Sequence, residues 1–199
     1  LCCAAITAWN ALAEMPVTAK DGGTVVTLGT GGVSLFALQL AKARGARVIS
    51  TSSSDEKLRR LKDLGADETI NYREVPEWGK AVLGLTDGLG ADLVVEVGGA
   101  DTIAQSMRAT RADGTMSLIG NVGGSIAEIN LPLVFMFRKR MIGISTGSVA
   151  DFADMMADLD GREDFHPALD DHVYEFDGLS DALQALPKGQ HFGKIAVRV

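Results

Sequence analysis

The sequence predicts an α/β fold, a doubly wound parallel sheet with helices on both faces, and three observations lead to this prediction. Short β-branched runs alternate with longer segments of helical period, and only short turns separate them. The runs are almost entirely apolar, as strands buried on both faces are. A glycine-rich turn joins the first run to the helix that follows it. Because such alternation needs crossover connections, we expect the strands to run parallel.

A helix over residues 7–15 is the first expected element, since its residues are good helix formers and Pro16 stands just beyond its end. Residues 24–28 (TVVTL) are a β-branched run, too short for a helix and bounded by glycines, which predicts a buried strand. Residues 33–44 place apolar side chains at helical spacing before a glycine, which predicts the next helix. Residues 47–50 predict a second strand.

The following helix is expected to begin with a capping box, in which Ser53 and Glu56 satisfy each other's backbone N–H groups. The alternation then continues, and the expected elements are this helix to Leu64, strand 68–72, helix 77–85, strand 92–97, helix 102–109 and strand 115–119. The pattern changes after Met141, where the expected elements are strand 141–146, helix 151–159, strand 172–176, helix 179–186 and strand 194–199. This tail of about fifty residues is small for an independent core.

Charge and composition disfavour several classes of function. A formal net charge of −7 disfavours a nucleic-acid partner, because an acidic surface repels phosphate backbones. The short basic run at 138–140 is typical of a solvated turn. No apolar stretch is long enough to span a membrane, so no membrane partner is expected. Cys2 and Cys3 are adjacent, which excludes a disulfide framework and favours a reducing cytoplasm.

The segment Gly29-Thr30-Gly31-Gly32-Val33-Ser34 lies between the first expected strand and a helix. In this pattern the first glycine permits a tight turn, the second lets the backbone approach a pyrophosphate, and the helix N-terminus attracts that anion. The third position usually holds Gly or Ala, and here it holds Ser34. In its context the segment predicts a dinucleotide site; the alternative is a turn whose glycines serve geometry alone.

The end of the second strand indicates which dinucleotide binds. A carboxylate there would accept hydrogen bonds from the adenosine ribose and favour NAD(H). The sequence has hydroxyl side chains at 51–54 instead, with Lys57 and Arg60 close behind. Hydroxyls and cations suit a 2′-phosphate, so we expect NADP(H) to be preferred over NAD(H). The alternative is that the serines only cap the following helix.

A set of motifs spans nearly the whole chain: LCCAAITAWNAL, GTGGVSLFALQLAKARGARVISTSSSDEKLRRLKDLGADETINYRE, ADLVVEVGG, LIGNVGG, GISTGS and GQHFGKIAV. Together they resemble the medium-chain dehydrogenase/reductase superfamily, in particular its zinc-type alcohol dehydrogenase and quinone oxidoreductase-like branch. The resemblance implies a Rossmann sheet of order 3-2-1-4-5-6. It also implies an NAD(P)-dependent oxidoreductase that transfers a hydride to or from a small carbonyl, alcohol or enone.

The resemblance further implies a layout of domains. Family members carry a catalytic domain before this region, and their C-terminal tail packs back on it. We therefore expect residues 1–20 to be a connecting segment and helix from an absent catalytic domain, 21–146 the NAD(P)-binding domain and 147–199 a C-terminal return segment. No catalytic residue is then expected here, and the chain alone is expected to be inactive. Family members also pair their sixth strands in a homodimer, and the apolar edge at 141–145 fits that role.

The resemblance assigns cofactor-binding roles to residues that follow strand ends or open the next helix. For the pyrophosphate these are Gly29, Gly31, Gly32, Val33 and Lys194. For the adenosine 2′ position and the adenine they are Ser52, Ser53, Lys57 and Tyr72. For the nicotinamide and its ribose they are Thr7, Val97, Gly98, Gly99, Ile119, Gly120, Asn121, Ser145 and Thr146.

Zinc and a few other candidates stay open on the sequence. Cys3 stands where zinc alcohol dehydrogenases have one ligand of the catalytic zinc, and the other ligands would lie in the absent domain. Cys3 is therefore either that ligand in the full enzyme or a small buried hydrophobe. His191 is more typical of a structural turn than of a catalytic base. Glu96, inside an apolar strand, either hydrogen-bonds a neighbouring loop or faces the cofactor.

Two other classes of function remain as alternatives. A catalytically silent NADPH-binding sensor or interaction module would keep the cofactor site without oxidoreductase activity. A methyltransferase also uses a glycine loop after its first strand. It needs an acidic residue at the end of its second strand, however, and Ser52 stands there in this sequence.

Overall fold

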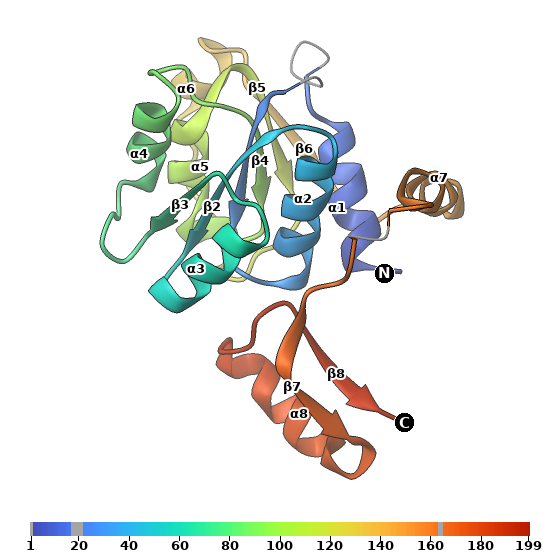
Figure 1. Cartoon of the computed structure of the whole chain (residues 1–199). Helices are drawn as coiled ribbons and strands as arrows, with labels where there is room; N and C mark the ends of the chain where they lie inside the picture. Colours follow the sequence, from blue (N-terminus) through green and yellow to red (C-terminus); the bar gives the residue numbers. More distant parts are fainter. Residues whose placement is uncertain (1, 17–21, 163–164) are drawn as a thin grey trace.

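The computed structural model describes residues 2–16, 22–162 and 165–199, and its main body is a six-stranded sheet in the order β3-β2-β1-β4-β5-β6 (Figure 1). All neighbouring strands of that sheet run parallel. The predicted doubly wound α/β sheet and its strand order are confirmed. The strands are β1 Thr24–Leu28, β2 Arg47–Ser52, β3 Glu68–Asn71, β4 Ala91–Glu96, β5 Thr110–Leu118 and β6 Arg140–Gly143.

Helices cover both faces of this sheet, and each face has its own hydrophobic cluster. The helices of the main body are α1 Ala4–Ala13, α2 Gly32–Ala43, α3 Asp55–Asp63, α4 Trp78–Leu85, α5 Ile103–Ala109 and α6 Leu131–Phe135. Leu38 of α2 and Val25 of β1 belong to one cluster, which α1 and α3 also line. Trp78 of α4, Met107 of α5 and Val26 of β1 belong to the other. Successive residues of β1 thus face opposite layers, which explains why the strand is apolar throughout.

Helix α1, predicted as a connecting segment, packs on the sheet beside α2. Ala5 and Ala8 are fully buried in the cluster that α1 shares with α2. The hydroxyl of Ser117 in β5 donates to the backbone oxygen of Ala11 at 3.0 Å. The predicted boundary at residues 20 and 21 lies outside the described residues.

The helix after β2 begins one residue later than predicted. The N-cap of α3 is Ser54, whose hydroxyl accepts the N–H of Lys57 at 3.4 Å, so the predicted capping box of Ser53 and Glu56 is wrong. The reason is that β2 extends to Ser52, and the Ser52 hydroxyl accepts the N–H of Ser54 at 3.4 Å. A run of serines offers several chemically equivalent caps, and the length of the strand decides which is used.

The residues after Gly147 add one helix to the main body and then form a small separate sheet. The added helix buries Met155 in the hydrophobic cluster that α1 lines. Helix α7 (Val149–Leu159) begins with a capping box between Ser148 and Asp151. The remaining elements are β7 Leu169–Glu175, the 3₁₀ turn η3 Phe176–Gly178, α8 Leu179–Ala185, the 3₁₀ turn η4 Leu186–Lys188 and β8 Lys194–Arg198. Strands β7 and β8 pair in parallel as a separate two-stranded sheet. In Figure 1 this β7–α8–β8 unit projects below the main sheet.

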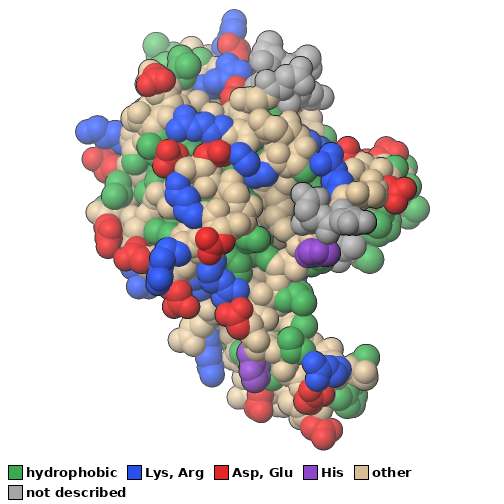
Figure 2. All heavy atoms as spheres, in the orientation of Figure 1, with side chains coloured by type: hydrophobic (Ala, Val, Ile, Leu, Met, Phe, Trp, Pro, Cys, Tyr) green, Lys and Arg blue, Asp and Glu red, His purple; other side chains and the backbone are tan. Residues whose placement is uncertain are grey.

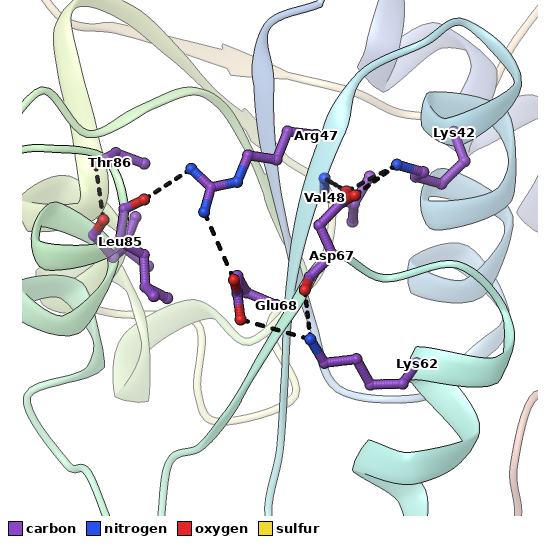
Figure 3. Close-up of polar contacts among 9 residues, drawn as sticks. Lys42, Arg47, Val48, Lys62, Asp67, Glu68, Leu85 and Thr86 are labelled. Atoms are coloured by element: carbon purple, nitrogen blue, oxygen red, sulfur yellow. Dashed lines mark hydrogen bonds and ion pairs between the residues drawn. The ribbon is translucent and has the colours of Figure 1, made fainter.

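Ion pairs and hydrogen bonds join the elements at the amino ends of β2 and β3 (Figure 3). Asp67, just before β3, accepts hydrogen bonds from the Lys42 ammonium at 2.8 Å and from the N–H of Val48 at 2.7 Å. Arg47 donates to the Leu85 carbonyl at 2.7 Å and pairs with Glu68 at 3.7 Å. These contacts lie at the end of the sheet opposite the carboxyl ends of the strands, where open α/β sheets bind their ligands.

The surface shown in Figure 2 carries cations and anions side by side, without a large patch of one sign. Hydrophobic side chains also reach this surface on the β7–α8–β8 unit (Figure 2). The exposed hydrophobic residues of that unit include Phe176, Leu183 and Leu186. In the described part of the chain, no helix is both long and apolar enough to cross a membrane.

Candidate dinucleotide-binding site

The glycine loop connects the carboxyl end of β1 to the amino end of α2, as the sequence predicts. Gly29 has a φ of +71°, a conformation that residues with a Cβ rarely adopt, and its N–H donates to the carbonyl of Thr51 in β2 at 2.9 Å. Gly31 is the N-cap of α2, and Gly32 and Val33 open the helix. A Cβ built on Gly29 or Gly31 would meet no atom within 4 Å. The loop therefore faces open space, into which an anion can approach the helix N-terminus.

Ser34 occupies the position where the pattern usually has Gly or Ala. Its side chain is buried, and its hydroxyl donates to the carbonyl of Leu28 at 2.6 Å. Leu28 is the last residue of β1, so this bond joins the end of the strand to the first turn of the helix. The polar residue is tolerated at a packing position because its hydrogen bond is satisfied.

Lys194, which is far away in sequence, lies over the start of α2. A Cβ on Gly32 would overlap the Lys194 side chain and would lie 2.6 Å from its Nζ. The chain is held there by the preceding residue, since Gly193 donates its N–H to the carbonyl of Thr30 at 2.9 Å and bridges with Gly31. Within the described part of the chain, the Lys194 ammonium has no hydrogen-bond acceptor, so its charge remains available to an anion at the loop.

The predicted adenosine end gathers at the carboxyl ends of β2 and β3. Ser52 is buried, Ser53 is half-buried, and Tyr72 is exposed. The N–H of Tyr72 donates to the carbonyl of Ser52 at 3.0 Å, so the two strand ends lie side by side.

The cations behind β2 contact the return segment. The Lys57 ammonium donates to the carbonyls of Gly189 and His191, each at 2.9 Å. Burial lowers the pKa of the Lys57 ammonium, and the nearby carboxylate of Asp170 opposes that effect only in part. Arg60 forms a bidentate pair with Asp171 at 2.9 and 3.0 Å and lies over the ring of Phe192, 4.0 Å from its centroid. The sequence did not predict these partners.

The predicted nicotinamide end consists of two loops that interlock through their backbones. One follows β4 and holds Val97, Gly98 and Gly99; the other follows β5 and holds Ile119, Gly120 and Asn121. The carbonyl of Gly98 accepts the N–H of Gly123 at 2.6 Å, and the carbonyl of Gly124 accepts the N–H of Ala100 at 2.9 Å. A Cβ on Gly120 would overlap the Val97 carbonyl, so the close approach requires glycine.

Three predicted residues lie around α1 and the segment after β6. Thr7 is buried, and its hydroxyl donates to the Cys3 carbonyl of its own helix at 2.8 Å. Ser145 and Thr146 are exposed, and the Thr146 carbonyl accepts the side-chain N–H of Asn10 at 2.6 Å. The Thr7 hydroxyl is therefore directed into the helix, whereas the side chains of Ser145 and Thr146 are accessible to a ligand.

Cys3, the candidate zinc ligand, lies at the surface. Cys2 and Cys3 are free and exposed in this chain, and the two interpretations of Cys3 in the full enzyme both stay predictions. In the ranges that the structure describes, His, Cys, Asp and Glu side chains form no group of three that fits a metal ion. A catalytic zinc needs three protein ligands, and Cys3 supplies at most one.

Comparisons with known proteins agree with this geometry. Residues 32–161 match a family model described as zinc-binding dehydrogenase. A zinc-type alcohol dehydrogenase-like protein of Schizosaccharomyces pombe is 44% identical over 202 residues, which cover 99% of this chain and 58% of that protein. The chain thus spans little more than half the length of this curated relative.

Solved structures give the same fold. An NAD-dependent alcohol dehydrogenase matches with a TM-score of 0.86 and 32% identity over 98% of this chain and 56% of its own. A mycobacterial protein in complex with NADPH matches with a TM-score of 0.80 and 26% identity over 98% of this chain and 62% of its own. These two neighbours differ in the nicotinamide cofactor that their descriptions name.

Proposed function

Because this chain belongs to the zinc-binding dehydrogenase family of the medium-chain dehydrogenase/reductase superfamily, we propose that it is the NAD(P)-binding portion of an oxidoreductase. The observation that supports this best is the open glycine loop at the start of α2, with the Lys194 ammonium above Gly32. The N-terminal N–H groups of a helix, the positive end of its dipole and a cation without an acceptor among the described residues together suit a pyrophosphate.

In this proposal each part of the chain has a separate task. The start of α2 and Lys194 bind the pyrophosphate, and the ends of β2 and β3 bind the adenosine. The loops after β4 and β5 present their backbones to the nicotinamide ribose, while Ser145 and Thr146 lie by the carboxamide. The bound cofactor accepts or donates the hydride that is exchanged with a small carbonyl, alcohol or enone. The chain holds and orients the cofactor and contributes no catalytic residue of its own.

NADP(H) is the preferred cofactor in this proposal. Residues 51–54 offer hydroxyls and no carboxylate that would repel a 2′-phosphate. The Lys57 ammonium has three N–H donors, of which Gly189 and His191 occupy two, so one remains for that phosphate. Arg60 takes no part, since Asp171 already holds its guanidinium.

Titration of this chain with NADPH and with NADH, followed by nicotinamide fluorescence, tests the cofactor site and the preference together. We expect both to bind, and NADPH to bind about tenfold more tightly, which corresponds to one charge-assisted hydrogen bond. Equal or tighter binding of NADH would reject the preference for NADP(H). Absence of binding by both would reject the dinucleotide site.

A pair of variants distinguishes the specific effect of Lys57 on cofactor preference from the general effect of removing one positive charge. Lys57→Met keeps the aliphatic stem and removes the ammonium, so it should abolish the difference between the two cofactors and leave the affinity for NADH unchanged. Lys188→Met is the matched control, because Lys188 is an exposed lysine directly before Gly189, one of the residues that Lys57 contacts. This control should leave both affinities as in the wild-type chain.

The remaining proposals concern metal, partner and compartment. We propose that Cys3 serves as one zinc ligand in the full enzyme, with the other ligands supplied outside the described residues. The exposed thiols of Cys2 and Cys3 suit a reducing compartment such as the cytoplasm. The edge of β6 suits a second copy of the chain, since β6 has a neighbour on one side only among the described strands.

A further inference from the structure

Glu96 is a buried carboxylate that none of the roles above uses. It is the last residue of β4 and is 1% exposed. Among the described residues no cation forms an ion pair with it. A carboxylate removed from water without a cation is costly unless hydrogen bonds replace its hydration, so its donors indicate why it is there.

Four donors converge on this carboxylate. Its Oε1 accepts the N–H of Gly98 at 2.7 Å, the N–H of Gly99 at 2.9 Å and the hydroxyl of Thr102 at 2.5 Å. Its Oε2 accepts the hydroxyl of Ser106 in α5. Three of these donors share Oε1 and one binds Oε2, so the chain itself supplies hydrogen bonds to both oxygens. Its buried position and these bonds indicate that Glu96 serves the surrounding backbone.

Most of these donors belong to the loop after β4. Gly98 and Gly99 open the 3₁₀ turn η2 (Gly99–Asp101) that leads into α5, so the carboxylate also lies at the positive end of a helical segment. Gly99 has a φ of +80°, and Glu96 holds the N–H of that residue in place. The same loop is hydrogen-bonded to the loop after β5. The N–H of Gly123 donates to the carbonyl of Gly98, and the N–H of Ala100 donates to the carbonyl of Gly124.

We propose that Glu96 is the positioning residue for the nicotinamide half of the cofactor site. Its carboxylate fixes the loop at 97–100 and, through that loop, the loop at 119–124, so that both present a preformed backbone surface to the nicotinamide ribose. This inference rests on the proposed function, because it presupposes a dinucleotide. It goes beyond that function by assigning one buried side chain to one half of the ligand.

Glu96→Gln tests the proposal, because glutamine keeps the shape and one acceptor oxygen but removes the charge. NADPH is compared with adenosine 2′,5′-bisphosphate, which has the adenosine half and lacks the nicotinamide ribose. We expect about tenfold weaker binding of NADPH, the loss of one charge-assisted hydrogen bond, and less than about a twofold change for the bisphosphate. Without ligand, amide hydrogen exchange at 98–100 and 119–124 should be faster than in the wild-type chain.

Two variants serve as controls. Asp92→Asn changes a carboxylate at the other end of β4, where Asp92 accepts the N–H of Thr24 at 2.7 Å and a bond from Arg111. It should lower the melting temperature without changing the ratio of the two affinities. Thr102→Val removes one donor from the loop side of Glu96, and should reproduce part of the effect of Glu96→Gln even if the latter folds poorly.

The binding results distinguish the positioning role of Glu96 from the proposed dinucleotide site itself. Unchanged binding of NADPH by Glu96→Gln would overturn the positioning role, and so would a parallel loss for both ligands, which would indicate a role in the fold alone. If the wild-type chain binds neither ligand, the proposed function fails. In that case the exchange rates of the two loops still decide whether Glu96 fixes them.

Discussion

At the scale of single residues, the polar groups of the site differ in whether the chain itself satisfies them. The hydroxyls of Thr7 and Ser34 donate to backbone carbonyls, and the carboxylate of Glu96 accepts from four donors. Such groups shape the site. The Lys194 ammonium has no acceptor among the described residues, and the loop at Gly31 faces open space. Unsatisfied groups of this kind are the ones that contact a ligand.

A substitution at Gly32 tests whether Lys194 binds the cofactor. The Cβ of Gly32→Ala would overlap the end of a flexible side chain, so the fold should survive while Lys194 moves away from the loop. We expect the melting temperature to stay close to that of the wild-type chain and the dissociation constant for NADPH to rise about threefold to tenfold. Calorimetry and fluorescence titration measure the two quantities.

Lys194→Met isolates the same contribution. It should weaken NADPH binding as much as Gly32→Ala does, and the double variant should lose little more, because both changes remove one interaction. Fully additive losses, or normal binding by Gly32→Ala, would show that the Lys194 ammonium is not used at the loop.

Part of the residue-scale picture was predictable and part was not. The roles proposed for Gly29 and Gly31 follow from their spacing after a strand, which is a local pattern. The carbonyl partners of Lys57 could not be predicted, because Gly189 and His191 are more than a hundred residues away and backbone carbonyls leave no signature in a sequence. For Glu96 the sequence left two options, and the structure selects the hydrogen bonds to the neighbouring loop.

At the scale of elements, the contacts at the amino ends of β2 and β3 fix α2 to the sheet. Asp67 joins α2, through Lys42, to β2, through the N–H of Val48 (Figure 3). Partial burial raises the pKa of the Asp67 carboxyl, but the hydrogen bonds from Lys42 and Val48 outweigh it, and the net pKa lies below its ordinary value. Asp67 therefore stabilises the fold in its charged form.

The lowered pKa of Asp67 leads to a pH-dependent prediction. A carboxyl whose pKa is lowered by folding stabilises the protein above its unfolded pKa of about 4, and that stability is lost as the pH falls through the folded value. Asp67→Asn should lower the free energy of unfolding by about 1 kcal/mol at pH 7, since the pair is partly solvated. The difference from wild type should shrink as the pH falls below about 4.

Urea unfolding at several pH values measures this difference. Asp63→Asn is the control, because Asp63 is an exposed carboxylate at the end of α3 without a hydrogen-bond partner among the described residues. A difference between Asp67→Asn and wild type that stays constant from pH 7 to pH 3 would contradict the assigned role.

The elements themselves were largely predictable. The alternation of apolar runs and helical segments predicts the strands from β1 to β6 because both faces of a parallel sheet are buried. Their ends were less predictable: β5 begins at Thr110 instead of Thr115, and Ser54 replaces Ser53 as the cap of α3. Neighbouring residues of similar propensity compete at such ends, and tertiary contacts decide between them.

At the scale of the whole molecule, the return segment meets the main body at the predicted cofactor site. Gly193 bonds to the glycine loop, and Asp171 and His191 contact α3. The sequence predicted that this tail is too small for a core of its own, and its β7–β8 sheet has only two strands. Its docking position could not be predicted, since it depends on contacts between distant segments.

The outer surface near β6 leads to the last prediction, which concerns assembly. Strand β6 is an edge strand, and beside it the segment from α6 to β6 exposes Leu131, Phe135 and Met136. An edge with unpaired backbone groups next to exposed apolar side chains favours pairing with another chain. A second copy supplies the same edge and the same apolar side chains, so a symmetric dimer covers both.

Sedimentation equilibrium over a range of concentrations should therefore show a dimer. Phe135 is 67% exposed, so Phe135→Glu should leave the fold intact and place two carboxylates close together across the dimer axis. We expect this variant to be a monomer at concentrations where the wild-type chain is dimeric.

Leu89→Glu is the matched control, because Leu89 is 72% exposed in the loop between α4 and β4, and β5 separates β4 from β6 in the sheet. If Leu89→Glu dissociated the dimer and Phe135→Glu did not, the interface would lie elsewhere. Dimer formation rises with protein concentration. If the wild-type chain stayed monomeric over the whole range, the β6 edge would therefore not be an interface between copies of this chain.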